Sequence, residues 1–203
     1  MDCPLSDTLL NLPGLTQIID AADYIEYVFN IRAIDFTAPV PTLQLSLVDT
    51  EGSGGSVDFS LAISDLTAFA IREYSWLGPH DISDAHPLLL HYQEPYSSLY
   101  IKGHTEHLKE LSFGLLQIHQ DTYGQWAVFL PQRFGMLEMG HALLAEGPQQ
   151  LIQRYAAKVN EYGMLTSILS GDTPAPSALK VFTLGDNYFI GTRFEFTVQR
   201  ESA

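Results

Sequence analysis

The chain has 203 residues, of which 46% are hydrophobic and 11% aromatic, and a formal net charge of −14. This apolar content can fill a hydrophobic core, which excludes an intrinsically disordered chain. No apolar run reaches the roughly 18 residues that cross a bilayer. A secretory signal begins with basic residues, and here no Lys or Arg precedes Arg32. Cys3 is the single cysteine, which excludes an internal disulfide and is typical of a reducing compartment. We therefore expect a soluble, cytoplasmic protein.

The negative charge is concentrated in the first half of the sequence. Residues 1–100 contain 14 acidic and 2 basic residues, a net of −12, whereas residues 101–203 contain 10 and 8, a net of −2. Such a field repels nucleic-acid phosphates and anionic lipid and attracts basic proteins. We therefore expect a basic protein partner, and neither nucleic acid nor a membrane. The alternative is that the charge serves only solubility.

The first elements in chain order are strands. Apolar and polar residues alternate over 23–36, 43–47 and 57–63, and this period of two is typical of half-buried strands. Three consecutive strands of this kind predict an antiparallel meander. The segment Leu66–Trp76 fits either a helix or a fourth strand, and we favour the strand, which Gly78-Pro79 then ends.

The stretch from Pro87 to Pro131 predicts a strand, a helix and a second strand. The strands are expected at 99–101 and 126–130, and the helix at about 105–123. Four apolar residues recur at the spacing of one helix face: Leu108, Leu111, Leu115 and Ile118. Thr105 is the expected N-cap and Gly124 the expected end.

Two apolar residues of this helix, Phe113 and Leu116, point away from the apolar face. Either the C-terminal helix covers them or they face a partner. The second reading suggests a structural or adaptor subunit of a larger assembly.

A second main helix is predicted over about 148–170, after Gly147-Pro148. Residues 136–145 fit a short helix interrupted by a glycine. A Pro-rich link at 173–177 leads to a terminal hairpin with arms at 179–184 and 188–198. Together these elements predict one α+β domain over residues 1–203. Its mostly antiparallel sheet, an N-terminal meander plus the C-terminal hairpin, is flanked by the two main helices.

Motifs for catalysis are few. Two His and two Asp occur in one loop, His80, Asp81, Asp84 and His86, and such side chains can bind a transition metal. A metal-assisted hydrolase using this loop is therefore one alternative, although loop Asp and His residues also cap turns. His104 and His107 lie one helical turn apart but lack the His-Glu-x-x-His pattern of metalloproteases, so we expect a packed histidine there. No nucleophile elbow, phosphate loop or dinucleotide-binding fingerprint occurs, and we expect a protein without cofactor or metal, more a binding protein than an enzyme.

Acidic residues are interleaved with aromatic residues in the first half of the chain. In a docking surface, aromatic side chains supply buried area and acidic ones select a basic partner. We therefore predict that eight residues bind the partner: Asp49, Glu51, Asp58, Asp65, Tyr74, Trp76, Asp81 and Asp84. An ordinary acidic loop region has the same composition.

Three segments, 57–63, 86–92 and 99–103, resemble a known class of protein. Their alternating and apolar patterns are similar to those of the small, acidic α+β immunity proteins that bacteria encode beside contact-dependent or secreted toxins. The resemblance implies a cytoplasmic bacterial protein that binds and blocks a cognate toxin without catalysis. It assigns no functional residue.

Overall fold

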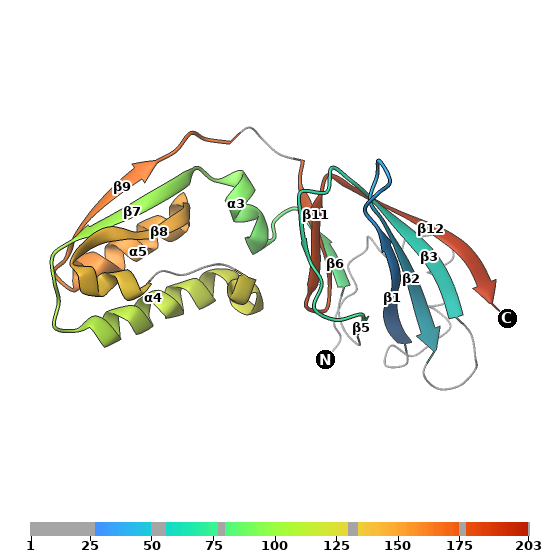
Figure 1. The fold of residues 1–203 in the computed structure, drawn as a ribbon, viewed down its shortest axis with the longest axis horizontal. Coiled ribbons are helices and arrows are strands. Elements are labelled where there is room, and N and C mark those ends of the chain that lie inside the picture. The colour runs from blue at the N-terminus through green and yellow to red at the C-terminus, as the bar shows by residue number, and fades with distance from the viewer. Residues whose placement is uncertain (1–26, 50–55, 77–79, 130–133, 175–177, 203) are drawn as a thin grey trace. The chain divides into compact units, whose positions relative to one another are not determined.

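The computed structural model describes residues 27–49, 56–76, 80–129, 134–174 and 178–202 (Figure 1). The chain forms two compact units, the first made of residues 1–85 and 178–203 and the second of residues 86–177. Each has its own sheets and buried side chains, and the single domain expected from the sequence stays a prediction. Within the described ranges, no helix combines the length and apolar character needed to cross a membrane.

The first unit contains a five-stranded antiparallel sheet with the spatial order β12-β3-β2-β1-β5. Its strands are β1 (Tyr27–Asp35), β2 (Thr42–Asp49), β3 (Ser56–Ser64), β5 (Ser75–Trp76) and β12 (Arg193–Ser202). Strands β1, β2 and β3 pair in sequence order, which confirms the predicted meander. The alternation of apolar and polar residues places one set of side chains on a single buried face, for example Phe29, Leu47 and Phe59.

A second, four-stranded sheet has the order β4-β11-β10-β6, also antiparallel. It consists of β4 (Ala68–Ala70), β6 (His80–Ser83), β10 (Lys180–Leu184) and β11 (Asn187–Gly191). Strands β4 and β5 confirm the preference for strand in Leu66–Trp76. The terminal hairpin is also confirmed, as β10 and β11.

The expected second arm of that hairpin is two strands rather than one. Strand β11 ends at Gly191, and β12 begins two residues later in the other sheet. The crossing is held at the end of β3, where the Thr192 N–H donates to the Ser64 carbonyl over 2.9 Å. The Thr192 hydroxyl also donates to the Asp65 carboxylate over 2.7 Å.

The core of the first unit lies between its two sheets. Phe182, Leu184 and Phe189 from the four-stranded sheet pack in one buried cluster with the apolar face of the five-stranded sheet. The rings of Phe182 and Phe196, one from each sheet, lie 5.4 Å apart in an edge-to-face arrangement. The first unit is therefore a β-sandwich.

The second unit contains a three-stranded antiparallel sheet with the order β8-β7-β9. Its strands are β7 (Tyr96–Lys102), β8 (His141–Pro148) and β9 (Leu165–Ser170). Its helices are η1 (Pro87–Leu89), α3 (Leu90–Gln93), α4 (Leu108–Tyr123), η2 (Gly124–Phe129), η3 (Phe134–Met139) and α5 (Gln149–Glu161). Helix α5 packs on all three strands, and α4 packs against α5.

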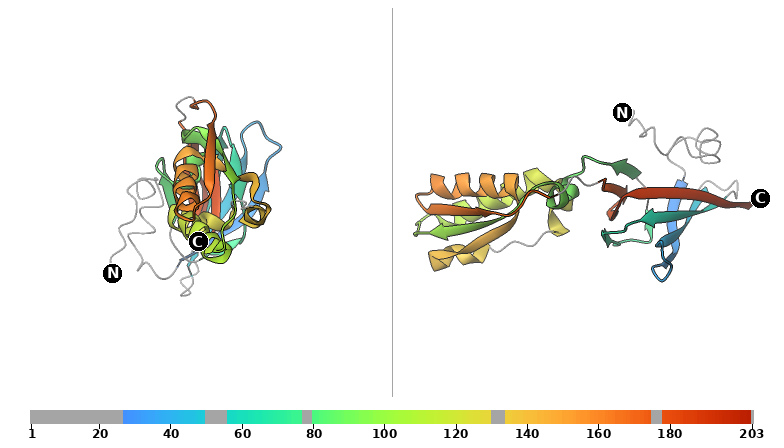
Figure 2. Two further views of the ribbon diagram at one scale, coloured as in Figure 1. Left: turned by 90° about the vertical axis from the view of Figure 1, so that its left-hand side faces the viewer. Right: turned by 90° about the horizontal axis from the view of Figure 1, so that it is seen from above.

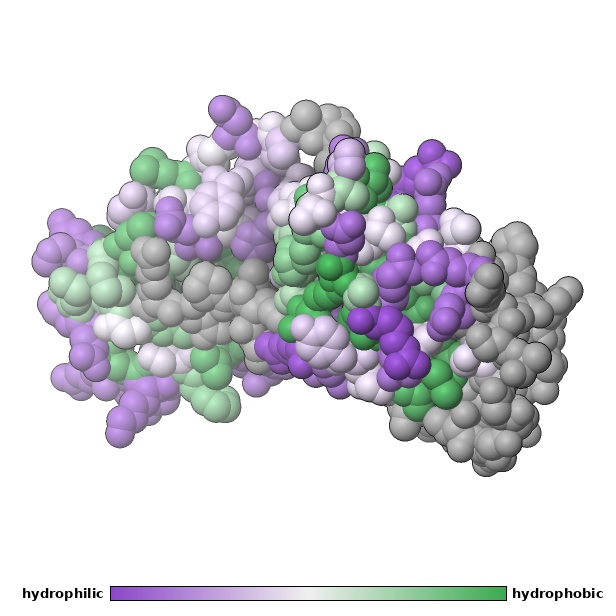
Figure 3. Space-filling view, turned by 45° about the vertical axis from the view of Figure 1, so that its right-hand side comes forward, coloured by the Kyte–Doolittle hydropathy of each residue, from purple (hydrophilic) through white to green (hydrophobic). Residues whose placement is uncertain are grey.

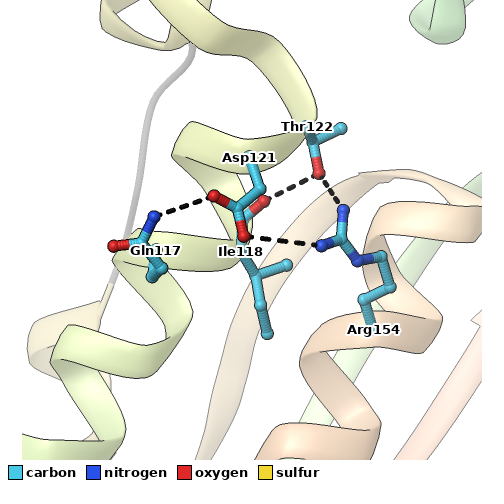
Figure 4. A network of polar contacts seen from close by, with 5 residues as sticks. All are labelled: Gln117, Ile118, Asp121, Thr122 and Arg154. Carbon is cyan, nitrogen blue, oxygen red and sulfur yellow. Dashed lines mark hydrogen bonds and ion pairs between the residues drawn. The ribbon is translucent and has the colours of Figure 1, made fainter.

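Polar contacts join the two long helices at their surface (Figure 4). Arg154 of α5 donates through Nη1 to the Thr122 hydroxyl of α4 over 2.6 Å, and its Nη2 lies 4.0 Å from an Asp121 carboxylate oxygen. Gln117 donates to the other oxygen of Asp121 over 2.8 Å. The ion pair is half exposed and contributes little stability; the contacts join the last turns of α4 to α5.

Three predictions for the second unit need correction. The strand expected at 126–130 is wrong, because residues 124–129 form the 3-10 helix η2. The short helix at 136–145 is also wrong, since η3 ends at Met139 and β8 follows. The helix expected over 148–170 ends at Glu161, where Gly163, with a positive φ of 80°, turns the chain into β9.

The helix predicted at 105–123 is confirmed as α4, and it ends at Gly124 as expected. It begins three residues later than predicted, at Leu108. The Thr105 hydroxyl accepts the His107 N–H over 3.2 Å, so it closes a turn before the helix instead of capping it. The predicted class is confirmed: the fold is α+β with mostly antiparallel sheets.

Gly191 is a point at which the sandwich tolerates no side chain. A Cβ there would lie 2.7 Å from both the Ile63 Cγ2 atom and the Ser64 carbonyl oxygen. We expect Gly191→Ala to lower the free energy of unfolding by roughly 1–3 kcal/mol through overpacking, measured by urea denaturation. Gly135→Ala is the control, since a Cβ there meets no atom within 4 Å. Equal stability of the two variants would contradict the close approach of β11 to β3.

Candidate protein-binding surface

The predicted acidic residues do not gather at one place in the first unit. Asp58 lies near the start of β3 and Asp65 directly after its end, so their backbones are roughly 20 Å apart at strand spacing. Asp49 ends β2 at the Asp58 end of the sheet, and Glu51 lies outside the described residues. Asp65 is engaged by Thr192 and therefore helps to hold the crossing between the sheets.

The other predicted residues lie elsewhere on the sandwich. Asp81 is in β6, an edge of the four-stranded sheet, and Asp84 is exposed just after that strand. Strand β5 is an edge of the five-stranded sheet. Tyr74 lies just before it, and Trp76, within it, pairs with Phe29 of β1. Hydrophilic and hydrophobic residues are interspersed over the face shown in Figure 3. The seven described residues are thus spread over the two sheets of the first unit and the segments beside them, and the role of all eight in binding stays a prediction.

The two histidines proposed as metal ligands lie in different elements, and His80 is in strand β6. His86 begins η1, where its Nδ1 accepts the Leu88 N–H over 3.2 Å and its ring packs on Trp126. His107 is exposed beside α4, with its ring 6.2 Å from that of Tyr162, so the expectation of a packed histidine there is wrong. Among the described residues, no three His, Cys, Asp or Glu side chains are grouped to hold a metal ion.

The packed histidine of the second unit is His119, which the sequence analysis missed. It is buried on α4, four residues after Leu115 on the same apolar face, and this spacing was the signal available. Its Nε2 lies 3.2 Å from the Ala127 carbonyl and its Nδ1 2.6 Å from the Tyr155 hydroxyl. A carbonyl can only accept, so Nε2 carries the proton, and the Tyr155 O–H donates to Nδ1. Burial lowers the pKa of His119 and keeps the ring neutral in this arrangement.

A second histidine and a tyrosine extend this polar cluster. The Tyr123 hydroxyl lies 3.3 Å from His91 Nε2, and the two rings stack. Burial, and then the charge of Glu94, raises the pKa of Tyr123 well above its ordinary value. Glu94 itself accepts the Gln150 N–H over 2.9 Å, at the positive end of α5. Because burial favours the neutral forms of the histidines and tyrosines, we assign this cluster to holding α4 and α5 in place.

Within the described part of the second unit, helices cover the sheet on one face only. On β7, buried residues (Leu99 and Ile101) alternate with exposed ones (Tyr96 and Tyr100). The uncovered side, called the open face below, carries the residues whose positions in the sheet register share the side of Tyr100: Tyr96, Ser98, Tyr100, Lys102, His141, Leu143, Glu146, Leu165, Ser167 and Leu169. The Ser98 hydroxyl donates to the Glu146 carboxylate over 3.2 Å. Figure 2 shows the helices and strands of this unit from two further sides.

Large apolar side chains are strongly exposed on the open face. Leu165 and Leu169 of β9 are 67% and 61% exposed, and Tyr96 and Tyr100 of β7 are 50% and 40% exposed. The sequence analysis missed these leucines because it assigned them to a helix. The available signal was the alternation within residues 165–170, which a strand places on one side.

One end of the open face is hollowed into an open pocket of about 780 Å³. Its lining includes Tyr100, Lys102 and His141 of the sheet and His104 from the turn after β7. The His104 ring lies directly over Gly140, whose positive φ of 69° and missing Cβ leave room for it. The pocket therefore brings His104 beside Lys102 and His141 at one end of the open face.

No protein-family model, curated protein or solved structure matches this chain. The candidate site is the open face, defined by the sheet register and by the exposure of its apolar side chains. What it can do chemically is bury apolar area against another surface, with hydrogen-bonding groups at the pocket end.

The burial of His119 predicts how stability depends on pH. Its pKa is lower in the folded protein than in the unfolded chain, where it is about 6.5. Below that pH the unfolded chain binds more protons, so we expect the free energy of unfolding to fall as the pH is lowered through about 6.5. His119→Leu should lower stability at pH 8 by roughly 2 kcal/mol, since Tyr155 and Ala127 lose a partner, and should flatten the pH dependence.

Urea denaturation between about pH 5 and pH 8 measures this effect. His107→Gln is the control, because that imidazole is exposed. If the free energy of unfolding depended on pH as before in His119→Leu, and less than before in His107→Gln, the result would contradict the role given to the burial of His119.

Proposed function

We propose that this chain is a non-catalytic binding protein that docks a partner protein on its open face. The observation that carries the proposal is the exposure of Tyr96, Tyr100, Leu165 and Leu169 on one side of the sheet. Single exposed apolar residues are ordinary, whereas a contiguous apolar patch with polar groups at its rim is typical of a protein interface. Tyrosines are among the residues that most often dominate binding energy.

The charge distribution supports a basic partner. The residues of the first unit include 16 acidic and 5 basic ones, a net of −11, and those of the second unit 8 and 5, a net of −3. An acidic unit in the same chain accelerates encounter with a basic protein and disfavours acidic competitors. The specific form of the proposal is an immunity or inhibitor protein that neutralises a basic toxin by binding it.

A second candidate function, an adaptor subunit of a larger assembly, is favoured by a different observation. Phe113 and Leu116 on α4 are 69% and 48% exposed. Helix α5 packs against α4 but leaves both side chains exposed, so the alternative in which the C-terminal helix covers them is wrong. In this alternative, α4 is the interface.

Paired substitutions separate the two surfaces. Tyr100→Asp puts a charge at the centre of the open face. We expect it to weaken the affinity for the basic partner protein, isolated beforehand by affinity capture with the unmodified chain, at least about tenfold. Phe113→Asp is the matched control on α4 and should leave the affinity unchanged. Both side chains are exposed, so neither change should lower the melting temperature. Affinity is measured by calorimetry with the purified partner; loss with Phe113→Asp alone would instead support the adaptor role.

The affinity should also depend on salt. We expect the association rate to fall several-fold between about 0.05 M and about 0.5 M salt, because screening weakens attraction between an acidic unit and a basic partner. Charge reversal at Asp58 and Asp84 of the first unit should reduce the rate further at low salt. Glu138→Lys in the second unit is the control. Stopped-flow or surface-plasmon measurements test this, and a salt-independent rate would contradict the basic partner.

A further inference from the structure

Strand β9 is an edge of its sheet without the usual protection against pairing. Among the strands that the structure describes, it pairs with β7 alone (Figure 1). Its sequence, Leu165–Ser170, contains no charge, proline or glycine, and its register with β7 is regular from Leu165 to Ser170. Natural edge strands are normally protected by charged residues, prolines or bulges.

The other edge of the same sheet shows that protection. Strand β8 carries Glu146 and Pro148, and its pairing with β7 shifts register between Leu99 and Tyr100. Helix η3 also packs against β8. The contrast marks β9 as the edge that can accept another strand.

The backbone groups available on β9 follow from the pairing with β7. Just beyond the strand, the Gly171 N–H donates to the Tyr96 carbonyl over 2.8 Å. Backbone N–H and C=O groups point to alternate sides along an antiparallel strand. The backbone groups that point to β7 are therefore those of Leu165, Ser167 and Leu169. The backbone groups that point away from β7 are those of Thr166, Ile168 and Ser170.

We infer that β9 pairs antiparallel with β9 of a second copy of this chain, about a two-fold axis at Ser167. In this register Leu165 lies opposite Leu169 of the second copy, so both exposed leucines of each copy gain an apolar neighbour. Thr166 lies opposite Ile168 of the second copy, which brings outward-directed backbone groups of both strands together. Because β9 has no charged residue, no like charges face each other across the pair. The pairing joins two three-stranded sheets into one six-stranded sheet.

The symmetry of the strand favours a second copy over an unrelated peptide. The exposed leucines lie two residues before and two residues after Ser167, so the strand is complementary to itself in the antiparallel sense. β-branched side chains at 166 and 168 also suit strand pairing. One strand pair forms a small interface, and we expect a monomer–dimer equilibrium with a roughly micromolar dissociation constant.

This inference does not rest on the proposed function, because it uses the edge of the sheet and needs no other protein. Ser167→Lys tests it, since two lysines would then face each other at the axis. Sedimentation velocity from about 1 to 200 µM should show a concentration-dependent dimer for the full chain and a dissociation constant at least about tenfold weaker for Ser167→Lys. Ser98→Lys is the control: it puts the same charge on the open face but on the central strand.

A cysteine cross-link tests the register. In a Cys3→Ser background, Ser167→Cys places two thiols opposite each other at a non-hydrogen-bonded pair, where Cα atoms are about 4.5 Å apart and a disulfide can form. Leu165→Cys is the control, since its counterpart in the second copy lies about 13 Å away. We expect oxidation to link Ser167→Cys dimers and not Leu165→Cys. A monomer at all concentrations, a dimer unaffected by Ser167→Lys, or equal cross-linking of both variants would overturn the inference.

Discussion

The functional surface depends on one packing constraint: a three-stranded sheet in the second unit is covered by helices on a single face. Helix α5 lies across β7, β8 and β9, and α4 packs against α5, so both long helices lie on the same side of the sheet. The alternation along β7 then requires Tyr100 to face away from the helices, while the Tyr96 ring, at the start of the strand, lies 6.4 Å from the ring of His91. Strand periodicity leaves their rings exposed, and the open face is the consequence.

The position of the helices depends on a buried polar cluster as well as on apolar contacts. His119 links α4 to Tyr155 of α5 and to the Ala127 carbonyl of η2. Glu94 accepts a backbone N–H at the start of α5, and Arg154 joins that helix to the end of α4. Directional bonds of this kind fix one arrangement of helices on the sheet, and a fixed scaffold keeps the open face ready for binding.

The sequence predicted the elements whose pattern is local. Alternation identified β1–β3, and an apolar stripe with Gly124 identified α4. It failed where two periods overlap, since Thr166 and Leu169 continue the helical spacing of Tyr162 although Gly163 ends the helix before them. The position of the acidic residues depends on sheet order, and the exposure of the open face depends on which layers are present. Neither property is local, so neither could be predicted from spacing.

The most direct test of the account is site-specific photocross-linking in the cells that produce the protein. A photoreactive phenylalanine replaces Tyr100 on the open face in one variant and Phe113 on α4 in another; both positions are exposed. We expect the variant at Tyr100 to give a covalent product with a basic protein and the variant at Phe113 to give none. Cross-linking from position 113 alone, or no product from position 100, would contradict docking on the open face.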